Sequence, residues 1–232
     1  MIKRNARLCL ALAPALAIPF LASLLYFVLL EDDTLARMVY VLAKIFLVVW
    51  PLLCAVFLLE VGFPKINLRN REHWHAVPIG LFLGGIIIGV LFGLMRTPLG
   101  EVVGLYAEPI RAKAQSLGIL KHYVIFALFL SVLHSFMEEY YWRWFVFGQL
   151  RRELRLAPAL AVAGVGFAAH HTIVVSQFFP LYLALPFGAI IGIAGVLWCV
   201  MYEEQKSLAG AWACHMMVDL GVMAIGYKLL MG

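Results

Sequence analysis

Apolar residues dominate this chain in runs of about 20, and short polar segments separate the runs. Seven runs can be drawn, over residues 8–30, 38–60, 76–95, 122–149, 157–176, 180–202 and 208–230. A helix of about 20 residues is long enough to cross the roughly 30 Å hydrocarbon core of a bilayer. The pattern therefore predicts an all-α, polytopic membrane helical bundle of about seven transmembrane helices.

The segments between the runs bear on domain organisation. Residues 97–120 are too polar to span, and we expect either an amphipathic helix along the interface or an ordinary loop. The first run is longer than the 7–15 apolar residues of a signal peptide, so we interpret it as a retained span. No internal repeat or low-complexity segment is evident. We expect a single integral membrane domain over residues 1–232, with N-terminal spans without a recognisable motif (1–121) and a C-terminal part (122–232) that carries the motifs described below.

Composition supports the membrane assignment. The chain is 64% hydrophobic and 13% charged, whereas about a quarter of the residues of soluble domains are charged. The net charge of +5 is attributed to basic loops facing the cytoplasm and anionic lipid, so no nucleic-acid partner is expected. The distribution of Lys and Arg, which includes Lys3, Lys65 and Arg69, favours a cytoplasmic N-terminus. The four cysteines show no CxxC spacing, which argues against a disulfide framework or a zinc ribbon.

Ionisable residues inside the predicted spans are the candidates for chemistry, because each charge near a bilayer centre costs roughly 2.5–3.5 kcal/mol. They are Lys44, His134, Glu138, Glu139, Arg143, His170, His171, His215 and Asp219. We interpret Lys44 as a snorkelling or inter-helix contact. The other eight belong to the fourth, fifth and seventh runs, and the main candidates lie at similar depths, roughly 12–20 Å from the cytoplasmic end. They are expected to meet in one cavity.

The spacing of these residues separates their roles. Glu139 and Arg143 are four apart with the acid first, the favourable order for a helical ion pair. Glu138 is rotated by about 100° from Glu139 and faces elsewhere. Two interpretations stay open: a polar network that fixes helix register, or a hydrolytic site in which Glu138 is the general base.

Three motifs on successive spans resemble a known pattern. They are Glu138-Glu139-Tyr-Tyr-Trp-Arg143, Phe167-Ala-Ala-His170-His171 and His215-Met-Met-Val-Asp219. Over residues 122–222 the chain is similar to the CPBP family, the CAAX-protease and bacteriocin-processing membrane proteins also called Abi. Its pattern is EExxxR, FxxxH and HxxxN or HxxxD, and the FxxxH spacing selects His171 as the second-motif histidine.

The resemblance implies an intramembrane endopeptidase. Glu138 and His171 would activate a water, and His215 with Asp219 would face the scissile carbonyl, Asp219 orienting the imidazole. Glu139 and Arg143 would brace their helix. The remaining histidines, His134 and His170, are expected to support the catalytic groups or to pack.

The resemblance also bears on cofactors and partners. The family is often labelled metalloprotease, but HExxH is absent, so we predict no metal. Zinc held by His171, His215 and a carboxylate is the alternative. The implied partners are the lipid bilayer and a membrane-anchored protein or peptide, cut near its C-terminus, and the implied location is a prokaryotic cell membrane. The rival hypotheses are a non-catalytic immunity or scaffold protein and a proton-coupled transporter.

Overall fold

The computed structural model describes residues 4–59 and 71–231, and its regular elements are helices, with no strand among these residues. Seven helices in this part of the chain are long and apolar enough to cross a membrane. They are Ala6–Leu29, Asp33–Leu58, Trp74–Leu94, Leu120–Glu153, Leu156–Val175, Leu181–Gln205 and Leu208–Met231. The predicted all-α, multi-pass membrane bundle is confirmed. Lys3, Lys65 and Arg69, used in the orientation argument, lie outside the described residues.

The chain divides into two compact units. The first comprises Met1–Arg69 and Met137–Val200, and the second Asn70–Phe136 and Met201–Gly232. Each unit therefore combines segments from distant parts of the sequence. The expectation of one integral domain stays a prediction.

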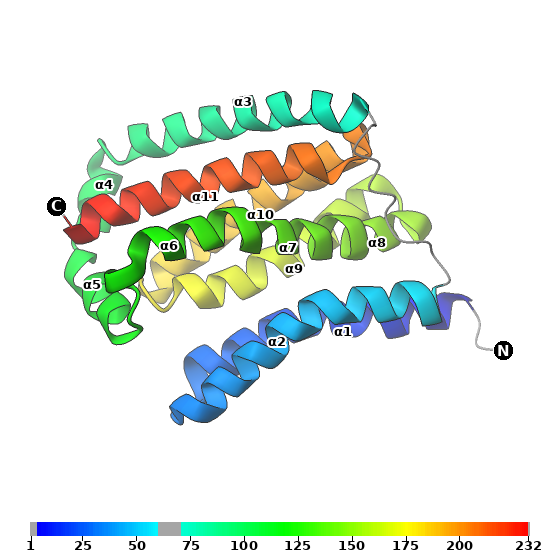
Figure 1. The fold of residues 1–232 in the computed structure, drawn as a ribbon, viewed down its shortest axis with the longest axis horizontal. Helices are drawn as coiled ribbons and strands as arrows, with labels where there is room; N and C mark the ends of the chain where they lie inside the picture. The colour runs from blue at the N-terminus through cyan, green and yellow to red at the C-terminus, as the bar shows by residue number, and fades with distance from the viewer. Residues whose placement is uncertain (1–3, 60–70, 232) are drawn as a thin grey trace. The chain divides into compact units, whose positions relative to one another are not determined.

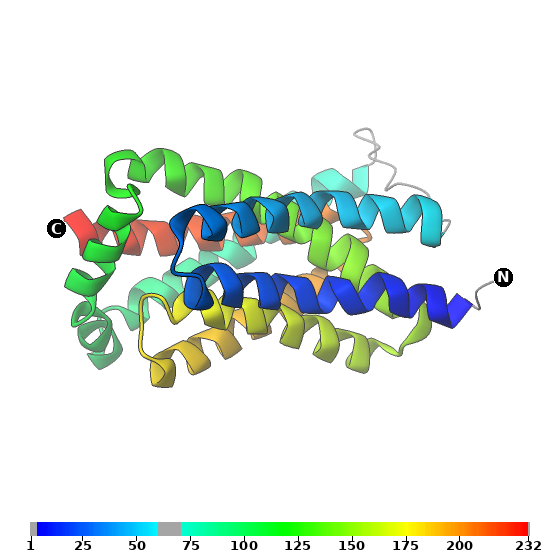
Figure 2. The same ribbon diagram turned by 90° about the horizontal axis from the view of Figure 1, so that it is seen from below.

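The first unit begins with two long helices that run side by side (Figures 1 and 2). Helix α1 (Arg4–Leu24) continues into the π-helix η1 (Leu25–Leu29), and α2 (Asp33–Leu53) continues into the π-helix η2 (Cys54–Leu58). The Asp32 side chain caps α2 by accepting hydrogen bonds from the backbone N–H groups of Thr34 and Leu35. The Trp50 indole N–H donates to the Ala11 carbonyl and ties α2 to α1.

The centre of the first unit is the π-helix η5 (Tyr140–Phe147), in which the seven residues after Tyr140 are buried. It lies between α7 (Ser135–Glu139) and α8 (Gly148–Glu153). The Tyr141 hydroxyl donates to the Ala15 carbonyl of α1. Helix α9 (Leu156–Val175) packs against both α1 and η5, and α10 (Leu181–Gln205) follows it. The aromatic residues of this segment are therefore part of the hydrophobic core.

The second unit is built on α3 (Arg71–Leu94) and α11 (Leu208–Met231), which lie side by side (Figure 1). Glycines make this approach close. A Cβ added to Gly80 would clash with the carbonyl oxygen of Gly210, and one added to Gly84 would lie 2.6 Å from the Cβ of Met217. Small residues at helix contacts are typical of membrane bundles, where close backbone approach supplies the packing energy.

The polar segment 97–120 is helical in the second unit. It forms α4 (Pro98–Gly104) and α5 (Ala107–Ser116), followed by the 3-10 helix η3 (Leu120–His122), α6 (Tyr123–Leu128) and the π-helix η4 (Phe129–His134). The Tyr123 hydroxyl donates to the Met223 carbonyl and fastens α6 to α11. A helix is thus confirmed, and its position along the membrane interface stays a prediction.

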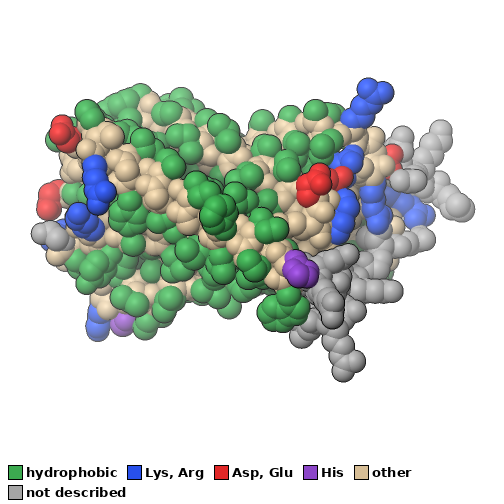
Figure 3. Space-filling view, turned by 90° about the horizontal axis from the view of Figure 1, so that it is seen from above, with side chains coloured by type: hydrophobic (Ala, Val, Ile, Leu, Met, Phe, Trp, Pro, Cys, Tyr) green, Lys and Arg blue, Asp and Glu red, His purple; other side chains and the backbone are tan. Residues whose placement is uncertain are grey.

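Exposed apolar side chains mark the surfaces that face lipid. On α3, Ile79, Phe82, Ile86 and Val90 recur every three or four residues, and each is at least 49% exposed. Hydrophobic side chains cover most of the face drawn in Figure 3. A stripe with this period would be unfavourable in water and is suited to hydrocarbon.

Candidate active site

The short helix α7 carries two adjacent glutamates and is flanked by two π-helical segments, η4 before it and η5 after it. Glu138 is 5% exposed and Glu139 is fully buried. π-Helical turns are rare and are often found at functional sites, because each inserts an extra residue and turns the following side chains. The local backbone of the fourth span is thus unusual where its charges lie.

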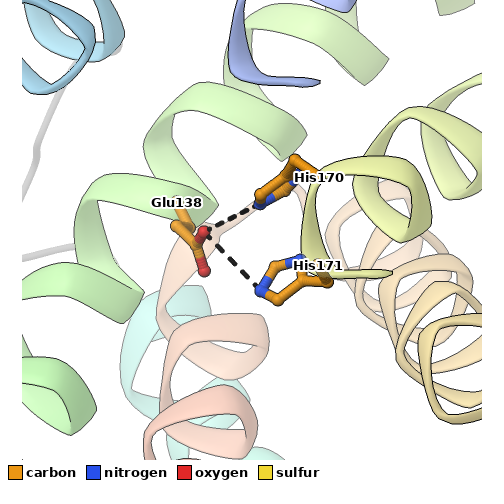
Figure 4. Close-up of side chains that lie close together, drawn as sticks. All are labelled: Glu138, His170 and His171. Carbon is orange, nitrogen blue, oxygen red and sulfur yellow. Dashed lines mark hydrogen bonds and ion pairs between the residues drawn. The ribbon is translucent and has the colours of Figure 1, made fainter. Parts of the chain in front are cut away.

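Glu138 faces two histidines from α9 (Figure 4). The Nε2 atom of His170 lies 3.4 Å from the Oε1 atom of Glu138, and the Nε2 atom of His171 lies 3.9 Å from the same oxygen. His170 is buried, whereas the side chain of His171 is 19% exposed. The three side chains belong to the first unit, so the structure brings the predicted Glu138 and His171 together.

The second nitrogen of each imidazole faces a backbone carbonyl of α9. His171 Nδ1 is 2.9 Å from the Phe167 oxygen, and His170 Nδ1 is 3.4 Å from the Gly166 oxygen. Because a carbonyl oxygen only accepts, Nδ1 of His171 serves as the donor in its 2.9 Å contact, and the neutral ring then turns a lone pair at Nε2 toward Glu138. Such a lone pair accepts a hydrogen bond from a donor such as water.

Aromatic rings fix the positions of the two histidines. The His170 ring stacks on Trp142 with centroids 5.4 Å apart and an interplanar angle of 3°. Phe167 contacts both imidazoles, with centroid distances of 5.4 Å to His170 and 4.3 Å to His171. Since Trp142 and Phe167 are buried, the imidazoles are held in a rigid and largely apolar environment.

Glu139 and Arg143 form the predicted ion pair. The Arg143 Nε atom lies 3.1 Å from the Glu139 Oε2 atom, and their side chains are 1% and 0% exposed. This N–H is not aligned for a hydrogen bond, so the contact is one of charge. The guanidinium carbon also lies 4.5 Å from the centre of the Phe167 ring and 5.1 Å from that of Trp198. Arg143 thus links α7 to the rings that hold the histidines.

His215 and Asp219 lie on α11 in the second unit. The His215 Nε2 atom is 3.6 Å from the Asp219 Oδ2 atom, and the side chains are 4% and 28% exposed. This proximity agrees with a carboxylate that orients the imidazole. His134 ends η4 in the same unit and is half-buried. The catalytic role of His215 and Asp219 and the supporting role of His134 stay predictions.

The donor set can be tested against a divalent metal. Ligand atoms from Glu138, His170 and His171 all lie within 4.8 Å of one another. Ligands of tetrahedral zinc are about 3.4 Å apart, so a small contraction would bring these three into range. Metal-binding histidines also donate their other N–H to a carbonyl or carboxylate, as His171 does here. The three residues therefore fit a metal, although this set differs from the zinc set considered from the sequence.

His170 is the residue whose position the sequence reasoning did not anticipate. Adjacent helical residues point about 100° apart, and the motif spacing selected His171 alone. In the structure, Nε2 of His170 lies closer to the Glu138 carboxylate than Nε2 of His171 does. The doubled histidine was the available signal, because two imidazoles on neighbouring faces can both reach a group that lies between those faces.

The fold and this group of side chains define a multi-pass membrane protein with a buried glutamate–histidine centre. Residues 120–221 match the model of a family described as "Type II CAAX prenyl endopeptidase Rce1-like". The matched segment is thus similar to the CAAX-protease family, in agreement with the three motifs, and the match supports an intramembrane endopeptidase of CAAX type. No curated protein and no solved structure matches the chain.

Proposed function

We propose that this protein cleaves a peptide bond near the C-terminus of a membrane-anchored protein, with a water activated by Glu138 and His171. The observation that carries the proposal is the 3.9 Å separation between Glu138 Oε1 and His171 Nε2. It is too long for a direct hydrogen bond and suits a water that donates to both atoms. His171 is the more exposed of the two histidines and so the more accessible to a substrate.

The proposed chemistry follows from the Nε2 lone pair of His171, which is directed toward Glu138. Glu138 accepts a proton from the water as the water oxygen attacks the carbonyl carbon. Glu138 then transfers that proton to the leaving amine as the carbon–nitrogen bond breaks. His171 holds the water through Nε2 because its Nδ1 proton is committed to the Phe167 carbonyl. His170 orients Glu138 from its position on Trp142.

We further propose that this reaction needs no metal, in keeping with the absence of HExxH. Zinc is the alternative, and Glu138, His170 and His171 would hold it. A bound zinc would polarise the carbonyl or make the water more acidic. We also propose that His215, oriented by Asp219, faces the scissile carbonyl, a role that follows from the resemblance of the motif His215-Met-Met-Val-Asp219.

The substrate class follows from the family and from the membrane. A buried centre within membrane-spanning helices is reached most directly by a substrate that is itself anchored in the bilayer. The family name specifies a prenyl substrate, so a peptide with a prenylated cysteine near a free C-terminus is the first substrate to test.

Glu138→Gln tests the proposal. The change keeps shape and hydrogen bonding and removes the base, so cleavage of a prenylated peptide should fall by about 10²–10⁴-fold. Membrane insertion and melting temperature should match wild type, since Glu138 is not the partner of Arg143. Cleavage at the wild-type rate by Glu138→Gln would overturn the mechanism. A wild-type protein that cleaves no prenylated peptide would point to the non-catalytic scaffold hypothesis.

A further inference from the structure

Lys44 is a charged residue in the middle of a membrane-spanning helix that the mechanism above does not use. It lies in α2, within the span Asp33–Leu58 and outside the segment 120–221 that matches the family. It is half-buried. Ionisable residues at this depth are costly, and they commonly mark a site for substrate or ion.

Two tyrosines accompany Lys44, and the three are here called the tyrosine–lysine cluster (Tyr26, Tyr40 and Lys44). The Lys44 ammonium lies 5.2 Å from the centre of the Tyr40 ring, one turn earlier on α2. The Tyr40 ring meets that of Tyr26 edge-on at 5.3 Å and 86°. The Tyr26 hydroxyl lies 3.2 Å from the Ser23 hydroxyl. Aromatic faces stabilise an ammonium without neutralising its charge, so Lys44 can still attract an anion.

Helix α2 packs next to the segment that carries the proposed catalytic base. The hydroxyl of Tyr140, two residues after Glu138, donates to the carbonyl of Val48, one turn after Lys44, and all of these residues belong to the first unit. An endopeptidase that cuts near a C-terminus must bring the terminal carboxylate, a second negative charge, close to its glutamate. In a low dielectric the two anions repel each other strongly, and a cation bound to the terminal carboxylate offsets the repulsion.

We propose that Lys44 binds the free C-terminal carboxylate of the substrate and so sets where the chain is cut, an inference that rests on the endopeptidase function proposed above. An extended chain advances about 3.5 Å per residue. A carboxylate held at Lys44 therefore fixes the number of residues between the terminus and the bond presented to Glu138. Tyr40 positions the ammonium, and Lys44 acts as a specificity-determining residue.

The test uses the full-length purified protein in lipid vesicles and two prenylated-cysteine peptides that differ only at the C-terminus. One ends in a free carboxylate and the other in a carboxamide. Wild type should cleave the carboxylate peptide with a kcat/KM about tenfold higher or more, expressed mainly in KM, as expected for loss of one charged contact. Lys44→Met should lower the rate on the carboxylate peptide to that on the carboxamide, and leave the carboxamide rate unchanged.

Two further variants complete the design. Lys44→Arg keeps the charge and should retain most of the preference. Lys228→Met removes an exposed lysine near the end of α11 and should behave as wild type. The unchanged carboxamide rate shows that Lys44→Met is folded.

The outcomes separate the two proposals. Equal cleavage of both peptides by wild type overturns the carboxylate site and leaves the endopeptidase in place. An equal loss on both peptides in Lys44→Met assigns Lys44 a structural role and also overturns it. No cleavage of either peptide by wild type overturns the proposed function and this inference together.

Discussion

Replacing Glu139 by Gln should reveal how the protein keeps a buried arginine in its core. The change leaves Arg143, which is 1% exposed, without the carboxylate that lies 3.1 Å from its Nε atom. Removing one partner of a buried ion pair costs about 3–5 kcal/mol, because the remaining charge is not solvated. The resulting defect should be one of stability rather than chemistry.

The magnitude can be refined from the contacts of Arg143. Its guanidinium keeps its positions at 4.5 Å from Phe167 and 5.1 Å from Trp198. Each such contact contributes about 0.5–2 kcal/mol, which places the expected loss near the lower limit, at about 3 kcal/mol. For a chain of this size, about 2–4 °C of melting temperature corresponds to 1 kcal/mol, so a decrease of about 6–12 °C is expected.

Thermal unfolding of purified variants in detergent provides the assay. Glu139→Gln combined with Arg143→Met should recover at least half of the lost stability, since both buried charges are then gone. Glu204→Gln removes an exposed glutamate and serves as the matched control, with no change expected. A Glu139→Gln protein that melts like wild type but cleaves nothing would refute this reasoning. It would make Glu139, rather than Glu138, the candidate base.

Two further predictions concern the metal and the helix packing. The purified protein should contain well under one zinc per chain by elemental analysis and keep its activity after treatment with a strong chelator. The zinc alternative would be favoured if the protein contained one zinc per chain, lost its activity when the chelator removed the zinc, and regained it when zinc was added back. Gly80→Ala should destabilise the protein by about 1–3 kcal/mol because its Cβ would meet the Gly210 carbonyl, whereas Gly85→Ala, with open space around its Cβ, should be neutral or stabilising by up to about 1 kcal/mol. Equal melting temperatures for these two variants would contradict the close approach of α3 and α11.

Much of the fold could be predicted because hydropathy is a local property. An apolar run of about 20 residues has few alternatives to a membrane-spanning helix, and the seven runs correspond to the seven spans. The Glu139–Arg143 ion pair could also be predicted from the sequence, since residues four apart on a helix are neighbours. For residues 97–120 the sequence indicated only that the segment is either a helix or a loop, and the structure shows two short helices there.

The geometry around Glu138 could not be predicted from the sequence. The π-helical segments η4 and η5 flank it, and nothing in their sequence distinguishes them from α-helix. The contact between Glu138 and His170 depends on the packing of α7 and α9, which no spacing rule contains. Sequence reasoning therefore identified the glutamate and ranked the two histidines by motif alone.

The parallel stack of Trp142 on His170 gives the protein a built-in optical reporter. An imidazolium ring quenches the emission of an indole in contact with it, whereas a neutral imidazole does so weakly. The fluorescence of Trp142 should therefore follow the charge of His170, and any cation or substrate that changes that charge. Trp142 is buried, as are Trp144 and Trp198, so solvent quenchers reach these three poorly and their signal can be separated from that of exposed tryptophans such as Trp74. Events at the glutamate–histidine centre can thus be followed in the unmodified protein, before any substrate is known.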